Sequence, residues 1–315
     1  MKTKVYINLN NFNDEWLCAT GELPAVVPFL TEEQQHKYLN RDDTPDSRKP
    51  VFMNLLEYAK NHIELTSIED CDFVVLPFKY GHSDATPYIQ EAKDAKKKIM
   101  VIFNDDSSED LPLNDEAIIL RTSFYKSKKK ENEYAMVPFS ADFYNGEAVI
   151  KTKKPSISFC GGLTHPLRQI ALKKIYDCED IESNFILRNG FWAPGVSKDV
   201  AIQEFNENVR NSLYGFCCRG AGNFSFRFGE VLSHGKIPVL IDSDCVLPFE
   251  HKIDWNQHAI VVPERDLDTI TDVILDHYEK TSSSEIMDIQ VRNRSLWKEY
   301  FTPLGFVKHL RDFIV

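Results

Sequence analysis

The sequence has no run of 18 consecutive apolar residues, which argues against a transmembrane helix. The apolar part of residues 1–8 is also too short to be the hydrophobic region of a signal peptide. Basic residues are in deficit, 37 against 48 acidic ones, which gives a net charge of −11 and a pI near 5.4. Proteins that bind a phosphate backbone are usually basic, so we expect no nucleic-acid partner. We expect a soluble cytoplasmic protein, and peripheral attachment at the inner face of a membrane stays open.

Paired cysteine motifs are also missing. The chain has seven cysteines, an odd number, and no C-x-x-C pair. Cys217 and Cys218 are adjacent, a spacing that suits neither a zinc site nor a disulfide. We therefore expect free thiols in a reducing compartment, most of them in the core.

Two ligand-binding motifs are absent as well. Residues 8–14, which follow the first expected strand, contain no glycine, so the G-x-G-x-x-G fingerprint of nucleotide-dependent oxidoreductases is missing. We find no convincing Asp-x-Asp motif for a divalent metal; Asp105-Asp106 and Asp242-Ser243-Asp244 come nearest. An oxidoreductase is therefore disfavoured, and we expect neither a metal nor another cofactor.

Short apolar runs dominate what is present. Runs such as Phe73–Leu76 and Ile99–Phe103 are typical of strands covered on both faces of a parallel sheet. In the first half we expect strands at 4–9, 72–77, 99–104 and 117–122, with helices near 49–62 and 86–97. The charged residues 126–133 are expected to form a solvated loop.

The second half repeats this alternation after the lysine-rich residues 151–155. We expect strands at 156–160, 184–188, 213–218, 237–241 and 259–262, with helices from 166 and at 199–211, 224–234, 266–280 and 284–300. The fold class is thus α/β, with two Rossmann-like doubly wound domains at 1–150 and 151–300. Residues 301–315 are expected to pack back on the first domain.

Residues 219–244 carry the most information about function. Gly220 and Gly222 allow a sharp turn and a close approach of a ligand to the backbone, and Asn223 or Ser225 can cap the helix that follows. The free N–H groups of a first helical turn suit an anion. This strand–turn–helix–strand order therefore predicts a nucleotide site, although an ordinary βαβ unit remains the alternative.

Arg227 and Glu230 are three residues apart, so both can lie on one face of that helix. The carboxylate could accept hydrogen bonds from ribose or sugar hydroxyls, and the arginine could neutralise a phosphate. A simple salt bridge on the helix is the structural alternative.

Several motifs occur together in a fixed order along the chain. In the second half they are Arg219-Gly220-x-Gly222, Ser225-x-Arg227-x-x-Glu230, Gly235-x-Ile237-Pro238-Val239, Pro248-Phe249-Glu250 and Asp254-Trp255, preceded by Phe159-Cys160-Gly161-Gly162 and Arg168. In the first half they are Asp72–Phe78, Arg121-Thr122-Ser123 and Pro138-Phe139. This series resembles the exostosin family of glycosyltransferases, strongly over 157–300 and more thinly over 70–140. Cys218 departs from the family pattern, which has proline there.

The resemblance implies a GT-B fold, in which two domains face a cleft, and sugar transfer from a nucleotide donor, UDP in our reading. It implies that the second domain binds the donor, through Arg168, Arg219, Gly220, Gly222, Asn223, Ser225, Arg227 and Glu230. In GT-B enzymes arginines and helix N-termini generally replace a metal at the leaving diphosphate. The acceptor is expected to be an oligosaccharide or a lipid-linked glycan in surface glycan synthesis.

The family is regarded as inverting, so a base should deprotonate the acceptor hydroxyl. By position at strand ends of the first domain, Asp105, Asp106, His82 and Asp84 qualify, and the sequence does not choose among them. Carboxylates at such ends also serve as helix caps. His165 and His234 are interpreted as structural, as are Asp254 (a helix cap) and Trp255 (in the core). A non-catalytic protein that binds sugar nucleotides or glycans on the same fold is the competing function.

Overall fold

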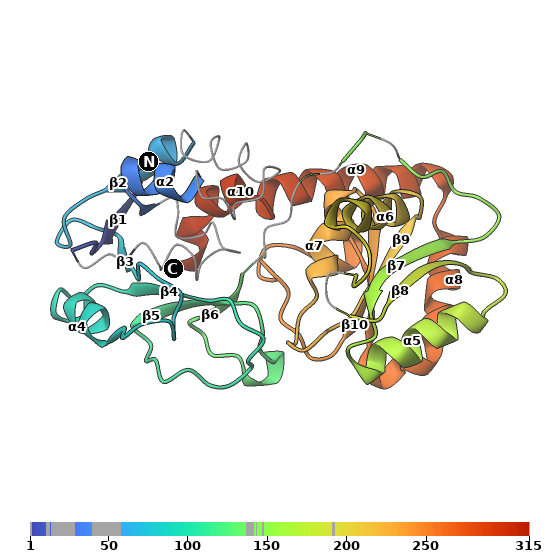
Figure 1. The fold of residues 1–315 in the computed structure, drawn as a ribbon, viewed down its shortest axis with the longest axis horizontal. Helices are drawn as coiled ribbons and strands as arrows, with labels where there is room; N and C mark the ends of the chain where they lie inside the picture. Colours follow the sequence, from blue (N-terminus) through green and yellow to red (C-terminus); the bar gives the residue numbers. More distant parts are fainter. Residues whose placement is uncertain are drawn as a thin grey trace. The chain divides into compact units, whose positions relative to one another are not determined.

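The structure is a computed structural model that describes residues 2–10, 13, 29–39, 58–136, 142, 144–146, 148–190 and 193–314. The chain forms two compact units (Figure 1). Unit 1 comprises Met1–Phe124, Lys128–Ala141 and Glu299–Val315, and unit 2 comprises Tyr125–Ser127 and Asp142–Lys298. The chain therefore contributes a short piece, Tyr125–Ser127, to unit 2 before the main part of that unit begins.

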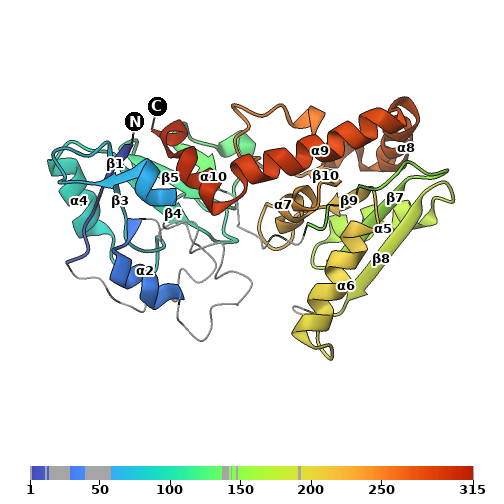
Figure 2. The same cartoon turned by 90° about the horizontal axis from the view of Figure 1, so that it is seen from above.

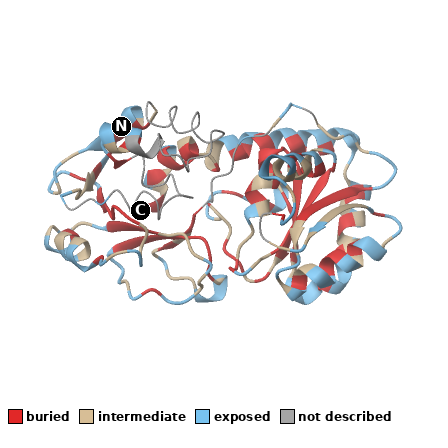
Figure 3. Ribbon diagram, viewed as in Figure 1, coloured by how far each residue is buried: buried red, intermediate tan, exposed pale blue. Residues whose placement is uncertain are grey.

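Unit 1 is built on a six-stranded sheet in which all strands are parallel. The strands are β1 (Thr3–Ile7), β2 (Ile63–Leu65), β3 (Phe73–Val75), β4 (Ile99–Phe103), β5 (Ala117–Arg121) and β6 (Glu133–Ala135), in the order β2-β1-β3-β4-β5-β6. The central strands are apolar and buried, as Figure 3 shows for both sheets. Their burial on both faces explains why their sequences do not alternate between apolar and polar residues.

Helix α4 (Thr86–Asp94) packs on this sheet through Tyr88 and Ala92, which join a core containing Val74 and Val101. Unit 1 also contains α2 (Glu32–Leu39), α10 (Pro303–Lys308) and η5 (Leu310–Phe313). The short helix η2 (Lys126–Lys128) has its first two residues in unit 2 and Lys128 in unit 1. Arg311 bonds to Asp72 at 3.2 Å. The C-terminal residues are thus held in unit 1.

Unit 2 is built on a five-stranded parallel sheet. The strands are β7 (Ser156–Gly162), β8 (Glu182–Arg188), β9 (Tyr214–Cys217), β10 (Ile237–Asp242) and β11 (Ile260–Pro263), in the order β11-β10-β9-β7-β8. The two parallel α/β sheets that the sequence predicts are therefore confirmed.

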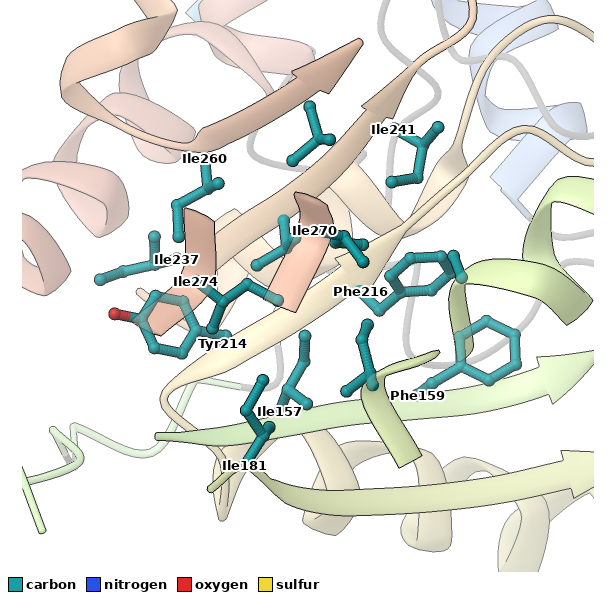
Figure 4. Close-up of a cluster of buried hydrophobic side chains, with 14 of the residues drawn as sticks. Ile157, Phe159, Ile181, Tyr214, Phe216, Ile237, Ile241, Ile260, Ile270 and Ile274 are labelled. Atoms are coloured by element: carbon teal, nitrogen blue, oxygen red, sulfur yellow. The ribbon is translucent and has the colours of Figure 1, made fainter. Parts of the chain in front are cut away.

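Helices cover both faces of the unit 2 sheet (Figures 1 and 2). They are α5 (Pro166–Asp177), α6 (Lys198–Arg210), α7 (Phe226–Ser233), α8 (Ile270–Lys280) and α9 (Ser283–Tyr300), with η3 (Trp255–Gln257) and η4 (Glu264–Thr269) between them. One face forms a core with α5 and α8, where Phe159 and Phe216 meet edge to face at 5.8 Å (Figure 4). Pro166 begins α5 in the first turn, where its missing N–H has no cost.

The predicted strands and the predicted helices that lie among the described residues agree with the structure, which adds two short strands and the short helices η2, η3, α10 and η5. Neither β2 nor β6 was expected, and β6 begins at Glu133, inside the stretch expected to be a solvated loop. The solvated-loop prediction is wrong for Glu133, because its side chain is only 2% exposed. The helix expected near 49–62 lies mostly outside the described residues, as do Cys18 and the Pro138-Phe139 motif.

Candidate functional site

The strand order of unit 2 contains a switch point between β7 and β9. From β7 the chain moves outward to β8 on one side, and then returns to β9 on the other side of β7. In open parallel sheets, ligands bind outside the carboxyl ends of strands at such a point. Here two segments, called the glycine turns below, leave neighbouring strands: Gly161–His165, which starts with the last two residues of β7, and Arg219–Gly222, which follows β9. The predicted donor-binding residues therefore come from the two turns at this point and from the helices that follow them.

Ser225 occupies the N-cap position of α7, but its side chain makes no capping hydrogen bond and its buried Oγ has no partner. Asn223 is bonded to the loop after β10. Its Oδ1 accepts a 2.7 Å hydrogen bond from Ser243, and its Nδ2 donates to the carbonyl of Asp244 at 3.3 Å. Asn223 thus ties the glycine turn to the loop after β10.

Arg168 lies in the first turn of α5 and reaches both glycine turns. Its Nη1 donates to the carbonyl of Gly162 at 3.0 Å and to Thr164 Oγ1 at 3.1 Å. Its Nη2 donates to the carbonyl of Cys218 at 3.0 Å. Burial lowers the pKa of this guanidinium below its ordinary value, and nearby Arg227 acts in the same direction. Three of its N–H donors are therefore occupied by the protein.

Arg227 and Glu230 lie on one face of α7, as the sequence predicts, with Nη1 3.0 Å from Oε2. Their side chains are 22% and 28% exposed. The Nη2 of Arg227 also donates to the carbonyl of Cys160 on β7, and the guanidinium lies 4.3 Å from the ring centre of Phe205. The salt bridge expected as the structural alternative is thus present, and Arg227 also bonds to the neighbouring strand.

Arg219 follows β9, and its Nη1 donates to the hydroxyl of Tyr125 at 3.1 Å. The guanidinium also lies 5.8 Å from the ring centre of Tyr125. Beside Tyr125, Ser127 donates from its backbone N–H to the carboxylate of Asp244 at 3.2 Å, within unit 2. Sequence reasoning missed Tyr125, because nothing local in the sequence predicts that this tyrosine meets a residue 94 positions away.

The carboxyl edge of the unit 1 sheet carries the candidate bases. Asp105 follows β4 and bonds to Lys79, which follows β3, at 2.8 Å. The hydrogen bond to Lys79, followed by that from the backbone of Ser107, lowers the pKa of Asp105. Asp106 and His82 are exposed. A carboxylate with a lowered pKa is a weak base, so Asp105 is less suited to take a proton than an unpaired carboxylate would be.

Two further networks hold this edge. Asn8 and Tyr6, from the β1 region, donate to opposite oxygens of Glu91 on α4 at 2.8 and 2.9 Å. Burial raises the pKa of Tyr6 to about 12, and the hydrogen bond to Glu91 adds to this shift. Arg121, at the end of β5, bonds to Glu133 at 2.8 Å with 1% and 2% exposure of the two side chains. Sequence reasoning missed Glu91 and the burial of Glu133.

Arg121 and Thr122 also hold the loop that carries Asp105. Arg121 donates to the carbonyls of Ser107 and Glu109 at 3.1 and 3.0 Å. The hydroxyl of Thr122 accepts from the N–H of Asp105 at 3.1 Å and donates to its carbonyl at 2.8 Å. The Arg121-Thr122-Ser123 motif of the sequence is therefore a support for the loop after β4.

Other polar residues have structural partners. Asp84 accepts from the N–H of Thr86 at the start of α4. Hydrogen bonding to the side chain of Thr86, and then to its backbone, lowers the pKa of Asp84. His234 is buried between Asn206 and the carbonyl of Glu230, and burial lowers its pKa to about 4. His165 caps α5. These contacts agree with the structural interpretation of the two histidines.

The predicted roles of Asp254 and Trp255 are confirmed. Asp254 accepts from the N–H of Asn256 and caps η3, while Trp255 is buried and donates to the carbonyl of Pro248 at 3.2 Å.

Within the described parts of the chain, no three His, Cys, Asp or Glu residues are grouped as metal ligands would be. No helix among the described residues has both the length and the apolar character needed to cross a bilayer.

Comparison with known proteins places this chain among sugar transferases. Residues 68–276, more than half of the chain, match the family described as Exostosin GT47 domain. The Exostosin-1 homolog of Caenorhabditis elegans is 36% identical over 104 residues, which are 33% of this chain and 26% of the worm protein. Exostosin-1 of Drosophila melanogaster is 37% identical over 98 residues, 31% of this chain and 12% of the fly protein. The aligned region thus spans only a minor part of either relative.

Solved structures with a similar chain course include a glycosyltransferase from Rickettsia africae. Its TM-score is 0.48 at 9% identity, over 99% of this chain and 98% of that chain. An α1,3-fucosyltransferase gives a TM-score of 0.42 at 13% identity, over 99% of this chain and 88% of that chain.

Proposed function

Because the chain belongs to the exostosin GT47 family of glycosyltransferases, we propose that it transfers a sugar from a UDP-sugar to a carbohydrate acceptor. The acceptor is an oligosaccharide or a lipid-linked glycan, and the reaction belongs to surface glycan synthesis. It takes place in the cytoplasm or at the inner face of a membrane. No metal takes part in this proposal.

The observation that carries the proposal is the chemistry at the switch point of unit 2. Two glycine turns meet there, α7 begins with an N-cap serine that makes no side-chain capping bond, and Arg219 stands at the end of β9. A helix N-terminus and an arginine both favour a diphosphate. Glu230, which is 28% exposed, is the proposed acceptor of hydrogen bonds from donor hydroxyls.

In the proposed reaction, the acceptor hydroxyl attacks the anomeric carbon of the donor sugar from the face opposite the diphosphate. The new carbon–oxygen bond forms as the bond to the diphosphate breaks, and the leaving diphosphate takes the electron pair. Positive groups aimed at that diphosphate lower the barrier, because its negative charge grows in the transition state. This mechanism inverts the configuration at the anomeric carbon.

A base must accept the proton of the acceptor hydroxyl, and Asp105, Asp106 and His82 of unit 1 are the candidates. The Lys79 contact and lowered pKa of Asp105 weigh against it. His82 is exposed, and an imidazole nitrogen can take up the proton of a hydroxyl, which suits a base. Single variants Asp106→Asn and His82→Gln, compared by kcat at saturating donor, distinguish the two.

Thermal denaturation with free nucleotides and nucleotide sugars, with and without a chelator, tests the proposal. A ligand that binds the folded state raises Tm by mass action. We expect UDP or one UDP-sugar to stabilise the wild type in chelator, and Arg219→Gln to lose that stabilisation. The charge-matched control is Lys173→Gln, whose lysine forms an exposed pair with Asp177 on α5.

Two results would change the conclusion. If no nucleotide shifts Tm of the folded wild type, the donor-site proposal fails. If UDP-sugar binds but a panel of glycan acceptors yields no free UDP, the non-catalytic binding role replaces the transferase.

A further inference from the structure

The hydrogen-bond ladder between β7 and β9 stops before either strand ends, and side chains connect the two strands beyond that point. Its register pairs are Ile157 with Tyr214 and Ser158 with Gly215, although β7 continues to Gly162 and β9 to Cys217. Beyond these pairs the two strands lack each other as hydrogen-bond partners in the ladder. Backbone carbonyls at the sheet edge still require donors.

Two arginines supply donors across this gap, in opposite directions. Arg168, on the helix that follows β7, donates to the carbonyl of Cys218 at the end of β9. Arg227, on the helix that follows β9, donates to the carbonyl of Cys160 on β7. Each helix thus bonds through its arginine to the strand that precedes the other helix.

The glycines of the two turns lie against the same guanidinium groups. A Cβ built on Gly161 would be 3.0 Å from Nη2 of Arg227, and one built on Gly220 would be 3.4 Å from Nη2 of Arg168. A larger residue at Gly161 would therefore require the guanidinium of Arg227 to give way by a few tenths of an ångström, whereas one at Gly220 would be in ordinary contact with Arg168. Gly161 thus makes room for a guanidinium.

We infer that Arg168 and Arg227 are positioning residues that hold the two glycine turns in one arrangement before a ligand binds. Arg168 has three donors committed to Gly162, Thr164 and Cys218, and Arg227 is committed to Glu230 and Cys160. Their role in sugar transfer rests on the proposed function, but the structural role does not. Arg219, by contrast, donates to the phenol of Tyr125 and to the carbonyl of Ala221 in its own turn.

Hydrogen–deuterium exchange of the ligand-free protein tests the inference. The variants are Arg168→Gln, Arg168→Lys, Arg227→Gln and Arg227→Lys, with Lys173→Gln as the control for removing a positive charge from α5. We expect Arg168 variants to speed exchange across the gap, in peptides covering 217–224, by about tenfold or more, because charged hydrogen bonds are lost there. Arg227 variants should do the same in peptides covering 159–166, and Lys173→Gln should change neither.

Lysine replacements separate positioning from direct charge. A lysine keeps the charge, but one ammonium cannot reproduce the planar fork that joins Gly162 and Cys218. We therefore expect Arg168→Lys to resemble Arg168→Gln in both exchange and donor KM, whereas Arg219→Lys should retain more donor binding than Arg219→Gln. If Arg168→Lys keeps wild-type donor KM and Arg168→Gln loses it, Arg168 acts on the ligand and the inference is overturned.

Unchanged exchange at the opposite turn, in a folded variant, would also overturn it. If the arginine variants do not fold, Gly161→Ala provides the test, because its methyl group would be 3.0 Å from Nη2 of Arg227. Faster exchange in peptides covering 159–166 supports the inference, and wild-type exchange there contradicts it. A wild type that binds no nucleotide would refute the proposed function while leaving the exchange result to decide this one.

Discussion

Unit 1 and unit 2 place their first five strands in the same order, but their carboxyl edges carry different chemistry. In unit 1 the second strand lies on one side of the first and the third on the other, as in unit 2. At the unit 1 edge, Lys79 is neutralised by Asp105, and Glu91 accepts from Asn8. At the unit 2 edge, Arg168, Arg219 and Arg227 gather around two glycine turns.

This comparison teaches that strand order and ligand chemistry are set separately. The order decides where backbone leaves room for a ligand, which is the switch point in each unit. The charges decide what can bind there. Paired opposite charges and amides suit neutral hydroxyl groups, whereas glycine turns with arginines suit an anion.

The largest effect is expected where unit 1 depends on a buried charge. Glu133→Ala leaves Arg121 buried without its carboxylate, and breaking such a pair costs about 3–5 kcal/mol. Urea denaturation should show this loss, with most of it recovered in the double variant Arg121→Met/Glu133→Leu. The more exposed pair of unit 2 is the contrast, because the side chains of Arg188 and Glu204 are 15% and 40% exposed. Glu204→Gln should therefore cost less than Glu133→Ala, about 1 kcal/mol. Equal losses in the two units would break the comparison.

The next largest effect is expected from substitution of Arg219, and it concerns activity. Removing one donor that stabilises transition-state charge costs about 10²–10³-fold in rate. We expect Arg219→Gln to lower kcat/KM by that factor in an assay of UDP release, with Tm close to that of the wild type. Lys79→Gln, which removes a cation from the unit 1 edge, should lower it far less. A larger loss from Lys79→Gln would mean that the anion site lies in unit 1.

Acid should weaken unit 2 before unit 1. His234 is buried with a pKa near 4, below its ordinary 6.5, so its contribution is fully present above pH 6.5 and is lost as pH falls toward 4. By linkage that loss is about 3 kcal/mol. Asp105 also has a lowered pKa, but its contribution is lost only below the ordinary value of a carboxyl, near pH 4.

Exchange measured peptide by peptide between pH 7 and pH 4.5 checks this order, after correction for the intrinsic pH dependence. His234→Gln should reduce the response of unit 2, to which His277 also contributes because burial lowers its pKa. The pKa of His62 in unit 1 is also lowered by burial. Because His62 is only partly buried, it should contribute less to the acid response than His234. Unit 1 opening first would contradict the expected order.

The third strands of the two units also differ. In unit 1 it is Phe73–Val75, with a side chain at each position, whereas β9 of unit 2 has Gly215 beneath α7. A Cβ on Gly215 would lie 2.2 Å from Cγ2 of Val231. Overpacking of this kind costs about 1–3 kcal/mol, so Gly215→Ala should lower the free energy of unfolding by that amount. Gly215→Ala/Val231→Ala should recover part of it, and an additive loss would show that the two residues do not conflict.

The smallest expected effect concerns Lys79. Its pair with Asp105 is partly exposed, at 25% and 39%, so Lys79→Met should change stability by about 1 kcal/mol or less. The pKa of Asp105 should rise toward its ordinary value, because the largest cause of its lowering is removed. An NMR titration of the carboxyl measures this shift. An unchanged pKa would assign the lowering to the backbone of Ser107.

The sequence could predict the strands and the donor-side motif because both depend on local patterns. Apolar runs such as Ile99–Phe103 must be covered on two faces, and Gly220 and Gly222 mark a turn wherever they occur. The partners of charged residues could not be predicted in this way. Glu133 stands in a lysine-rich stretch that looks solvated, and only the pairing of β5 with β6 brings it to Arg121.

The same limit applies to the candidate site. Arg168, Arg219 and Arg227 all read as phosphate ligands in the sequence, since each stands near a glycine turn. A sequence does not show which backbone carbonyls a side chain will reach, and here the carbonyls of Cys160 and Cys218 accept hydrogen bonds from Arg227 and Arg168. The contact between Arg219 and Tyr125 could not be predicted either, because the two residues are far apart along the chain.

The close approach of Gly161 to Arg227, and of Gly220 to Arg168, has a consequence for how this sequence can diverge. The two members of each pair are distant along the chain but lie in contact in space. A side chain at Gly161 requires the guanidinium of Arg227 to give way by a few tenths of an ångström, whereas one at Gly220 would be in ordinary contact with Arg168. Gly161 and Arg227 should therefore covary among relatives more strongly than Gly220 and Arg168.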